Sequence, residues 1–181
     1  MNEHVLILGG AKSGKTGLAL SLAEAASGEL VYLATAQAYD QEMVERISRH
    51  QAERGPAWCT VEEPLALVET LRRLDQPGLV VLVDCLTLWM SNLMTQADLD
   101  EEGVGARARE LAEALPGLVA KVILVGNEVG LGIVPDNALA RRFRDQAGAL
   151  NQALARVAGR VVLVVAGLPQ YLKGTAEAPA A

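Results

Sequence analysis

Short apolar runs alternate with helical stretches along this chain. The apolar runs occupy residues 5–8, 29–33, 58–61, 79–84, 121–125 and 160–165. Runs without polar alternation are typical of parallel strands that are covered on both faces. The stretches between them predict helices over 17–26, 40–54, 64–74, 86–94, 106–115 and 137–158, and an acidic surface loop over 96–105.

This alternation of strands and helices predicts an α/β fold. The sheet is expected to be mostly parallel, with helices on both faces. A chain of 181 residues can bury a substantial core. We therefore expect a single domain over 1–174 and a flexible tail over 175–181.

The composition of the chain limits the kinds of molecule and cellular location that we expect for the protein. Apolar residues make up 51% of the chain but aromatic residues only 3%, so the core is expected to be built from Leu, Val and Ala. The net charge of −6 and the lack of a basic run argue against a nucleic-acid partner. No stretch approaches the roughly 18 apolar residues of a membrane span. Cys59 and Cys85 have no metal-ligand spacing and are predicted to be buried free thiols, which favours a cytoplasmic protein.

A glycine-rich loop follows the first predicted strand. It fits the phosphate-binding pattern G-x-x-x-x-G-K-[ST] with Gly9, Gly10, Ala11, Lys12, Ser13, Gly14, Lys15 and Thr16. The backbone N–H groups of such a loop, together with the N-terminus of the following helix, attract phosphate. We expect Lys15 to reach the β- and γ-phosphates and Thr16 to hold Mg²⁺. The sequence therefore predicts a nucleoside triphosphate site.

Two further strand ends belong to the same predicted site, because the carboxyl ends of parallel strands face the ligand. Asp84 ends an apolar run in the Walker B manner and is predicted to hold Mg²⁺ with Thr16. Ala34, Thr35 and Ala36 follow the second strand and are small enough for close approach. No N-K-x-D motif is present, so the residues leave the choice between ATP and GTP open.

The helix predicted over 40–54 allows two interpretations. Arg46, His50 and Arg54 are spaced four apart and share one face. Two guanidinium groups would keep the imidazole neutral and nucleophilic, and would bind phosphate oxygens. The same face could instead be a solvated, salt-bridged surface. The helix alone favours that second interpretation.

The whole set of motifs resembles the bifunctional adenosylcobinamide kinase / adenosylcobinamide-phosphate guanylyltransferases of cobalamin biosynthesis. The match covers nearly the whole chain and is most specific at Asn127-Glu128-Val129-Gly130 with Gly132-Ile133-Val134-Pro135. It also includes the phosphate-binding loop, Ala34-Thr35-Ala36, Glu42-Met43, Arg46-Ile47, His50, Trp58, Glu62, Asp84-Cys85-Leu86-Thr87, Arg144-Asp145, Asn151-Gln152 and Ala166-Gly167-Leu168-Pro169. Gly55-Pro56 departs from the link that relatives often carry after the histidine helix.

The resemblance implies a RecA-like P-loop NTPase fold, a homotrimer and two reactions. ATP or GTP first phosphorylates the aminopropanol hydroxyl of adenosylcobinamide. A histidine that matches His50 then attacks the α-phosphorus of GTP, and GMP passes to adenosylcobinamide phosphate to give adenosylcobinamide-GDP. The positions that match GTP contacts of the family are Gln51, Ala52, Glu53, Arg54, Glu62 and Asp84.

Two alternative functions, each from another class of protein, remain at this point. One is a simple phosphoryl-transfer kinase in which His50 has only a structural role. The other is a non-catalytic nucleotide switch whose loop over 126–135 signals to a partner. A covalent guanylyl-protein is expected only from the bifunctional enzyme.

Overall fold

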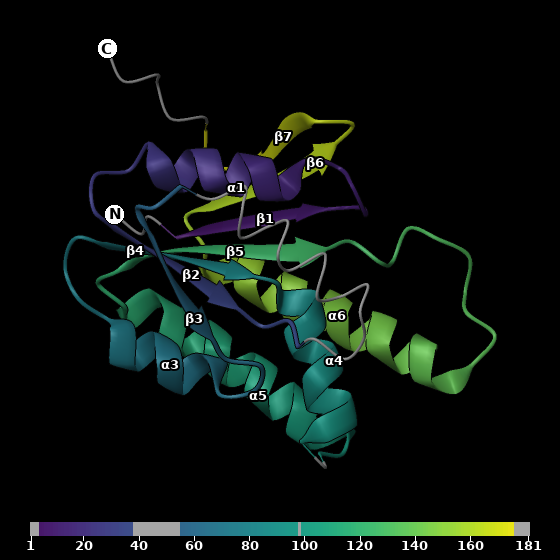
Figure 1. Cartoon of the computed structure of the whole chain (residues 1–181). Helices are drawn as coiled ribbons and strands as arrows, with labels where there is room; N and C mark the ends of the chain where they lie inside the picture. The colour runs from purple at the N-terminus through teal and green to yellow at the C-terminus, as the bar shows by residue number, and fades with distance from the viewer. Residues whose placement is uncertain (1–3, 38–54, 98, 176–181) are drawn as a thin grey trace.

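A seven-stranded sheet organises the fold (Figure 1). In the computed structural model, which describes residues 4–37, 55–97 and 99–175, the strand order is β3-β2-β4-β5-β1-β6-β7. The strands are β1 (Val5–Gly9), β2 (Glu29–Ala34), β3 (Trp58–Glu62), β4 (Leu79–Asp84), β5 (Lys121–Asn127), β6 (Arg160–Val165) and β7 (Leu168–Lys173). Neighbouring strands pair in parallel except β6 and β7, which form an antiparallel hairpin. The prediction of a mostly parallel α/β sheet is confirmed.

Helices cover both faces of this sheet. Their bounds are α1 (Lys15–Glu24), α3 (Leu67–Leu74), α4 (Leu86–Gln96), α5 (Glu101–Ala114) and α6 (Ala138–Val157), with a 3₁₀ turn at η1 (Leu115–Gly117). Of the helices that the structure describes, α1 covers one face, whereas α3, α4, α5 and α6 cover the other (Figure 1). None of the described helices is long and apolar enough to cross a membrane.

The central strand β4 shows why its run is apolar at every position. Val80 and Leu82 pack in the core on the α1 face, whereas Val81 and Val83 pack against the helices of the opposite face. Successive side chains of a strand point to opposite faces. Asp84 comes next in this alternation and therefore belongs to the α1 face.

The prediction of an acidic loop over 96–105 is wrong for its second half. The helix α5 begins directly after Asp100, whose side chain accepts a hydrogen bond from the Gly103 N–H at 2.8 Å. Further along α5, Arg107 donates to both carboxylate oxygens of Glu69 on α3 at 2.8 Å. The cap and these packing contacts outweigh the low helix propensity of the glycines.

The helix predicted over 64–74 begins later than expected. It starts at Leu67, so the proline before it lies outside the helix and not in its first turn. The Glu63 carboxylate accepts hydrogen bonds from the N–H groups of Leu65 at 3.0 Å and Ala66 at 2.8 Å. This side chain satisfies the backbone N–H groups of a turn that stands in place of the predicted first helical turn.

The strand β7 is not predicted by the sequence pattern. Ala166 and Gly167 form the turn before it, with φ values of 52° and 80°. A two-residue hairpin turn of this kind needs positive φ at both positions, and Ala rarely adopts it. A proline at position 169 also argues against a strand in the sequence, because proline lacks a backbone N–H. It is tolerated here because β7 is an edge strand.

The prediction that both cysteines are buried is wrong for Cys59. Cys59 is exposed on β3, which is the edge strand of the sheet, whereas Cys85 is buried directly after β4. An edge position leaves a side chain in contact with water even when the local sequence is apolar. Both thiols are free, as predicted.

Candidate active site

The loop between β1 and α1 adopts a conformation that depends on its glycines. Gly14 has a φ of 95°, and a Cβ there would lie 3.2 Å from the Gly167 Cα. A Cβ on Gly9 would lie 2.5 Å from Ser13 Oγ and 2.6 Å from the Val164 carbonyl oxygen. Residues with side chains therefore do not fit at these two positions. The loop turns sharply here and leads directly into the N-terminus of α1.

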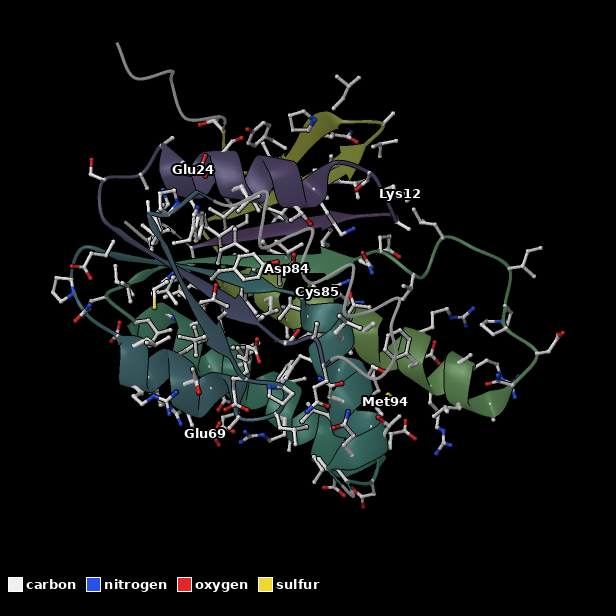
Figure 2. The ribbon with its side chains drawn as sticks, in the orientation of Figure 1. Lys12, Glu24, Glu69, Asp84, Cys85 and Met94 are labelled. Atoms are coloured by element: carbon white, nitrogen blue, oxygen red, sulfur yellow. The ribbon has the colours of Figure 1, made fainter. Side chains whose placement is uncertain are left out.

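Lys15 and Ser13 place polar groups inside this loop. The Lys15 side chain is buried, and its Nζ donates to the Gly10 carbonyl oxygen at 2.9 Å, so the ammonium folds back over the loop. Ser13 Oγ is buried and lacks a hydrogen-bond partner among the described residues. Buried polar groups normally have a partner. A buried cation and an unsatisfied hydroxyl in one loop favour a bound anion. Lys12, by contrast, is exposed at the N-terminal end of α1 (Figure 2).

Neighbouring loops hold the phosphate-binding loop from two sides. The Glu128 N–H, just after β5, donates to the Gly9 carbonyl oxygen at 3.1 Å. The Gly167 N–H, in the β6–β7 turn, donates to the Ser13 carbonyl oxygen at 2.8 Å. These bonds join the loop to the ends of both strands that flank β1. Its shape is therefore fixed by the fold before any ligand binds.

Asp84 lies at the carboxyl end of β4, beneath α1 (Figure 2). Its Oδ2 accepts a hydrogen bond from the Tyr32 hydroxyl at 2.6 Å. Asp84 and Thr16 offer hard oxygen ligands on the α1 side of one sheet edge, which suits Mg²⁺. Within the described ranges, no three or more His, Cys, Asp or Glu side chains are grouped so that they could hold a metal ion by themselves. Mg²⁺ typically takes one or two protein ligands plus nucleotide phosphates, so this donor set fits it.

The segment after β2 is fixed by its own hydrogen bonds. Thr35 is fully buried, and its Oγ1 donates to the Cys85 carbonyl oxygen at 2.8 Å and accepts from the Cys85 N–H at 2.9 Å. Asn92 on α4 donates to the carbonyl oxygens of Thr35 at 2.8 Å and Pro64 at 3.1 Å. Thr35 therefore joins the ends of β2 and β4, flanked by half-buried Ala34 and Ala36. Contact of these three residues with nucleotide stays a prediction.

Burial and its charged neighbour alter the chemistry of Cys85. Burial, together with the adjacent Asp84 charge, raises the pKa of the Cys85 thiol to about 11. A thiol with this pKa is protonated at neutral pH and is a poor nucleophile. We therefore expect Cys85 to support the strand end and not to act as a nucleophile.

The loop over 126–135 is fastened at both ends. At its start, the Asn127 N–H donates to Thr87 Oγ1 on α4 at 2.7 Å. At its end, Arg141 on α6 donates to the carbonyl oxygens of Pro135 at 2.9 Å and Asp136 at 2.7 Å. These bonds hold the two ends of a long loop with several glycines, and the bond from the Glu128 N–H to the Gly9 carbonyl oxygen keeps its first residues beside the phosphate-binding loop.

Glu62 is a described residue of the predicted site that the fold does not bring to the phosphate-binding loop. Glu62 is exposed at the end of edge strand β3, four strand spacings or about 19 Å from β1. His50 and the segment Gln51, Ala52, Glu53 and Arg54 lie outside the described residues. Their roles stay predictions. Tyr32 was missed by the sequence analysis, because a tyrosine within an apolar strand carries no signal of its own.

The other histidine of the chain is part of the core. His4 is 4% exposed, and its Nδ1 accepts a hydrogen bond from the Val122 N–H at 3.2 Å. It precedes β1, so the length of that strand, about 16 Å, separates it from the phosphate-binding loop. His4 therefore has a structural role.

A glycine-rich loop between a central strand and a helix, with an aspartate at the end of a nearby strand, defines a P-loop NTPase. Solved structures agree at the level of the fold. A prototypical ATPase from the type III secretion system of pathogenic bacteria aligns with a TM-score of 0.53 and 13% identity, covering 93% of this chain and 56% of that chain. The ATPase EscN of enteropathogenic E. coli aligns with a TM-score of 0.56 and 10% identity, covering 91% of this chain and 43% of that chain.

Sequence comparison identifies the family within this class. Residues 5–172 match the family model described as cobinamide kinase / cobinamide phosphate guanyltransferase, and the chain belongs to this family. It is 50% identical to the bifunctional adenosylcobalamin biosynthesis protein CobP of Pseudomonas aeruginosa, over 93% of this chain and 96% of the relative. It is 41% identical to the bifunctional protein CobU of Escherichia coli K12, over 93% of this chain and 99% of the relative.

Proposed function

We propose that this enzyme carries out two successive steps of cobalamin nucleotide-loop assembly. It phosphorylates the aminopropanol hydroxyl of adenosylcobinamide with ATP or GTP, and it then transfers GMP from GTP to the product. The observation that carries this proposal is the match to a bifunctional family over residues 5–172, with a complete phosphate-binding loop in place. The free thiols support a reducing location, and we propose the cytoplasm.

The first step needs charge stabilisation and positioning more than covalent chemistry. Lys15 binds the β- and γ-phosphates, and the N-terminus of α1 adds its dipole. Thr16 and Asp84 hold Mg²⁺, which neutralises the charge on the phosphates. The substrate hydroxyl attacks the γ-phosphorus, and the nucleoside diphosphate leaves. No protein nucleophile is required.

The second step requires a nucleophile on the protein, for which we propose His50. The imidazole nitrogen bonds the α-phosphorus of GTP and pyrophosphate leaves. The phosphate oxygen of adenosylcobinamide phosphate then attacks the same phosphorus and releases the histidine. The chain contains 2 histidines. His4 is buried before the start of β1, at the other end of this strand from the phosphate-binding loop, and its Nδ1 accepts a hydrogen bond from the Val122 N–H. This burial supports the assignment of the nucleophile to His50.

We also propose that copies of the chain associate as a homotrimer, which the family resemblance implies. Large apolar side chains are exposed on both loops that hold the phosphate-binding loop. Leu131 is 85% exposed and Ile133 97% exposed in the loop after β5, and Leu168 is 73% exposed after the β6–β7 turn. Exposed large apolar side chains are typical of interaction surfaces when they form a contiguous patch, and we propose that these three contribute to the interface between copies.

A pair of variants tests the two-step assignment. His50→Ala is expected to phosphorylate adenosylcobinamide at a rate close to wild type but to lose guanylyl transfer by several orders of magnitude. Lys15→Ala is expected to lose both reactions, because the phosphates lose their cation. The assay uses GTP labelled at the α-phosphorus, followed by denaturation in alkali, in which a phosphoramidate is stable.

The outcomes separate the alternatives. Label retained by the wild type and lost in His50→Ala supports the bifunctional mechanism. A wild type that phosphorylates the corrinoid without retaining label would indicate a simple kinase. A wild type that binds GTP without either reaction would indicate a nucleotide switch. Label retained by folded His50→Ala would remove this histidine from the mechanism.

A further inference from the structure

Tyr32 brings a hydroxyl group from the buried middle of β2 to the predicted metal carboxylate. It lies in the middle of β2 and is 4% exposed. Its hydroxyl donates to Asp84 Oδ2 at 2.6 Å across the β2–β4 pair. In the register of these strands Tyr32 is opposite Leu82, two residues before Asp84, so the bond runs diagonally on one face of the sheet. A long ring is needed to span this diagonal.

Trp58 contacts the Tyr32 ring from β3, the strand that pairs with β2 on the side opposite β4. The two rings meet edge to face, with centroids 6.2 Å apart and planes at 81°. The indole Nε1 of Trp58 in turn donates to Glu24 Oε1 on α1 at 3.2 Å. A row of contacts therefore runs from the last turn of α1 through Trp58 and Tyr32 to Asp84. Trp58 is among the residues that carry the family resemblance, but the sequence alone does not predict its role.

We propose that Tyr32 is a positioning residue for Asp84, with Trp58 as its support; this inference rests on the proposed function of Asp84 as a metal-facing carboxylate. The hydroxyl occupies Oδ2, which fixes the plane of the carboxylate and leaves Oδ1 for the metal. Partners of this kind orient metal ligands, and their removal typically weakens metal binding about 10- to 100-fold. A tyrosine with only a structural role would not affect metal binding.

The test is Tyr32→Phe, which removes one oxygen and keeps the ring. Mn²⁺ binding to the nucleotide-loaded protein is titrated by electron paramagnetic resonance, and Mg²⁺ dependence of corrinoid phosphorylation is measured separately. We expect Mn²⁺ affinity to fall by about 10-fold or more, and the Mg²⁺ requirement to rise in parallel. Nucleotide binding in the presence of EDTA is expected to stay within about 2-fold of wild type, because the phosphate-binding loop is untouched.

Tyr171→Phe on β7 is the matched control, because it makes the same chemical change on an edge strand away from Asp84. It is expected to bind Mn²⁺ like the wild type. If Tyr32→Phe does not fold, Trp58→Phe tests the inference in its place. We expect its Mn²⁺ affinity to fall as well, but by less than in Tyr32→Phe. Wild-type Mn²⁺ affinity in whichever of these two variants folds would overturn the inference. A wild type that binds nucleotide and Mn²⁺ but does not phosphorylate the corrinoid would overturn the proposed function instead.

Discussion

Replacing Thr35 with valine tests how the end of β2 is joined to the end of β4. The Thr35 side chain is 0% exposed and exchanges two hydrogen bonds with the backbone of Cys85. Valine fills the same space but has no hydroxyl. The Cys85 carbonyl keeps a second partner, the Trp89 N–H at 3.1 Å, whereas the Cys85 N–H is left buried without one.

The size of the effect follows from this difference. A buried N–H without a partner costs about 1–3 kcal/mol, and the second lost bond about 1 kcal/mol. We therefore expect the free energy of unfolding to fall by about 2–4 kcal/mol. In a domain of this size each kcal/mol corresponds to about 2–4 °C, so the Tm is expected to fall by roughly 6–12 °C for a loss of about 3 kcal/mol.

Urea denaturation of wild type and variant measures this loss, and Thr70→Val is the matched control. Thr70 is also buried, at 1% exposure, but its hydroxyl bonds the Arg73 side chain at 3.2 Å. Arg73 is exposed and can bond water instead, so Thr70→Val is expected to cost less than about 1 kcal/mol. Equal losses in the two variants would refute the reasoning, because they would trace to the hydroxyl itself and not to the backbone that it satisfies.

Two other predictions concern exposure. A thiol reagent at pH 8 is expected to label one cysteine per native chain, Cys59, and two after denaturation. Cys85 is buried and, with a pKa of about 11, is only about 0.1% thiolate at this pH. Rapid labelling of both thiols in the native protein would contradict this prediction. Leu168→Glu is expected to convert the proposed trimer to monomers in light scattering after gel filtration, whereas Val119→Glu, at 63% exposure just before the start of β5, is not. A trimer that survives Leu168→Glu would exclude the β6–β7 hairpin from the interface.

The sequence alone determined the features that depend on local pattern. The central strands are covered on both faces, so their apolar runs predict them, and β4 ends at Asp84 as expected. The phosphate-binding loop was equally predictable, because a positive φ at Gly14 and close contacts at Gly9 exclude residues with a side chain at these two positions. The family followed from motifs of the same local kind.

Tertiary structure decided what depends on neighbours distant in the sequence. The start of α5 and the strand β7 contradict local propensity, and packing and strand pairing outweigh it. The bond from Tyr32 to Asp84 joins residues 52 apart in the chain, and only the parallel register of β2 and β4 brings them together. Local sequence identifies a carboxylate at the end of a strand, but its orientation depends on a side chain from the adjacent strand, because strand pairing sets which residues meet.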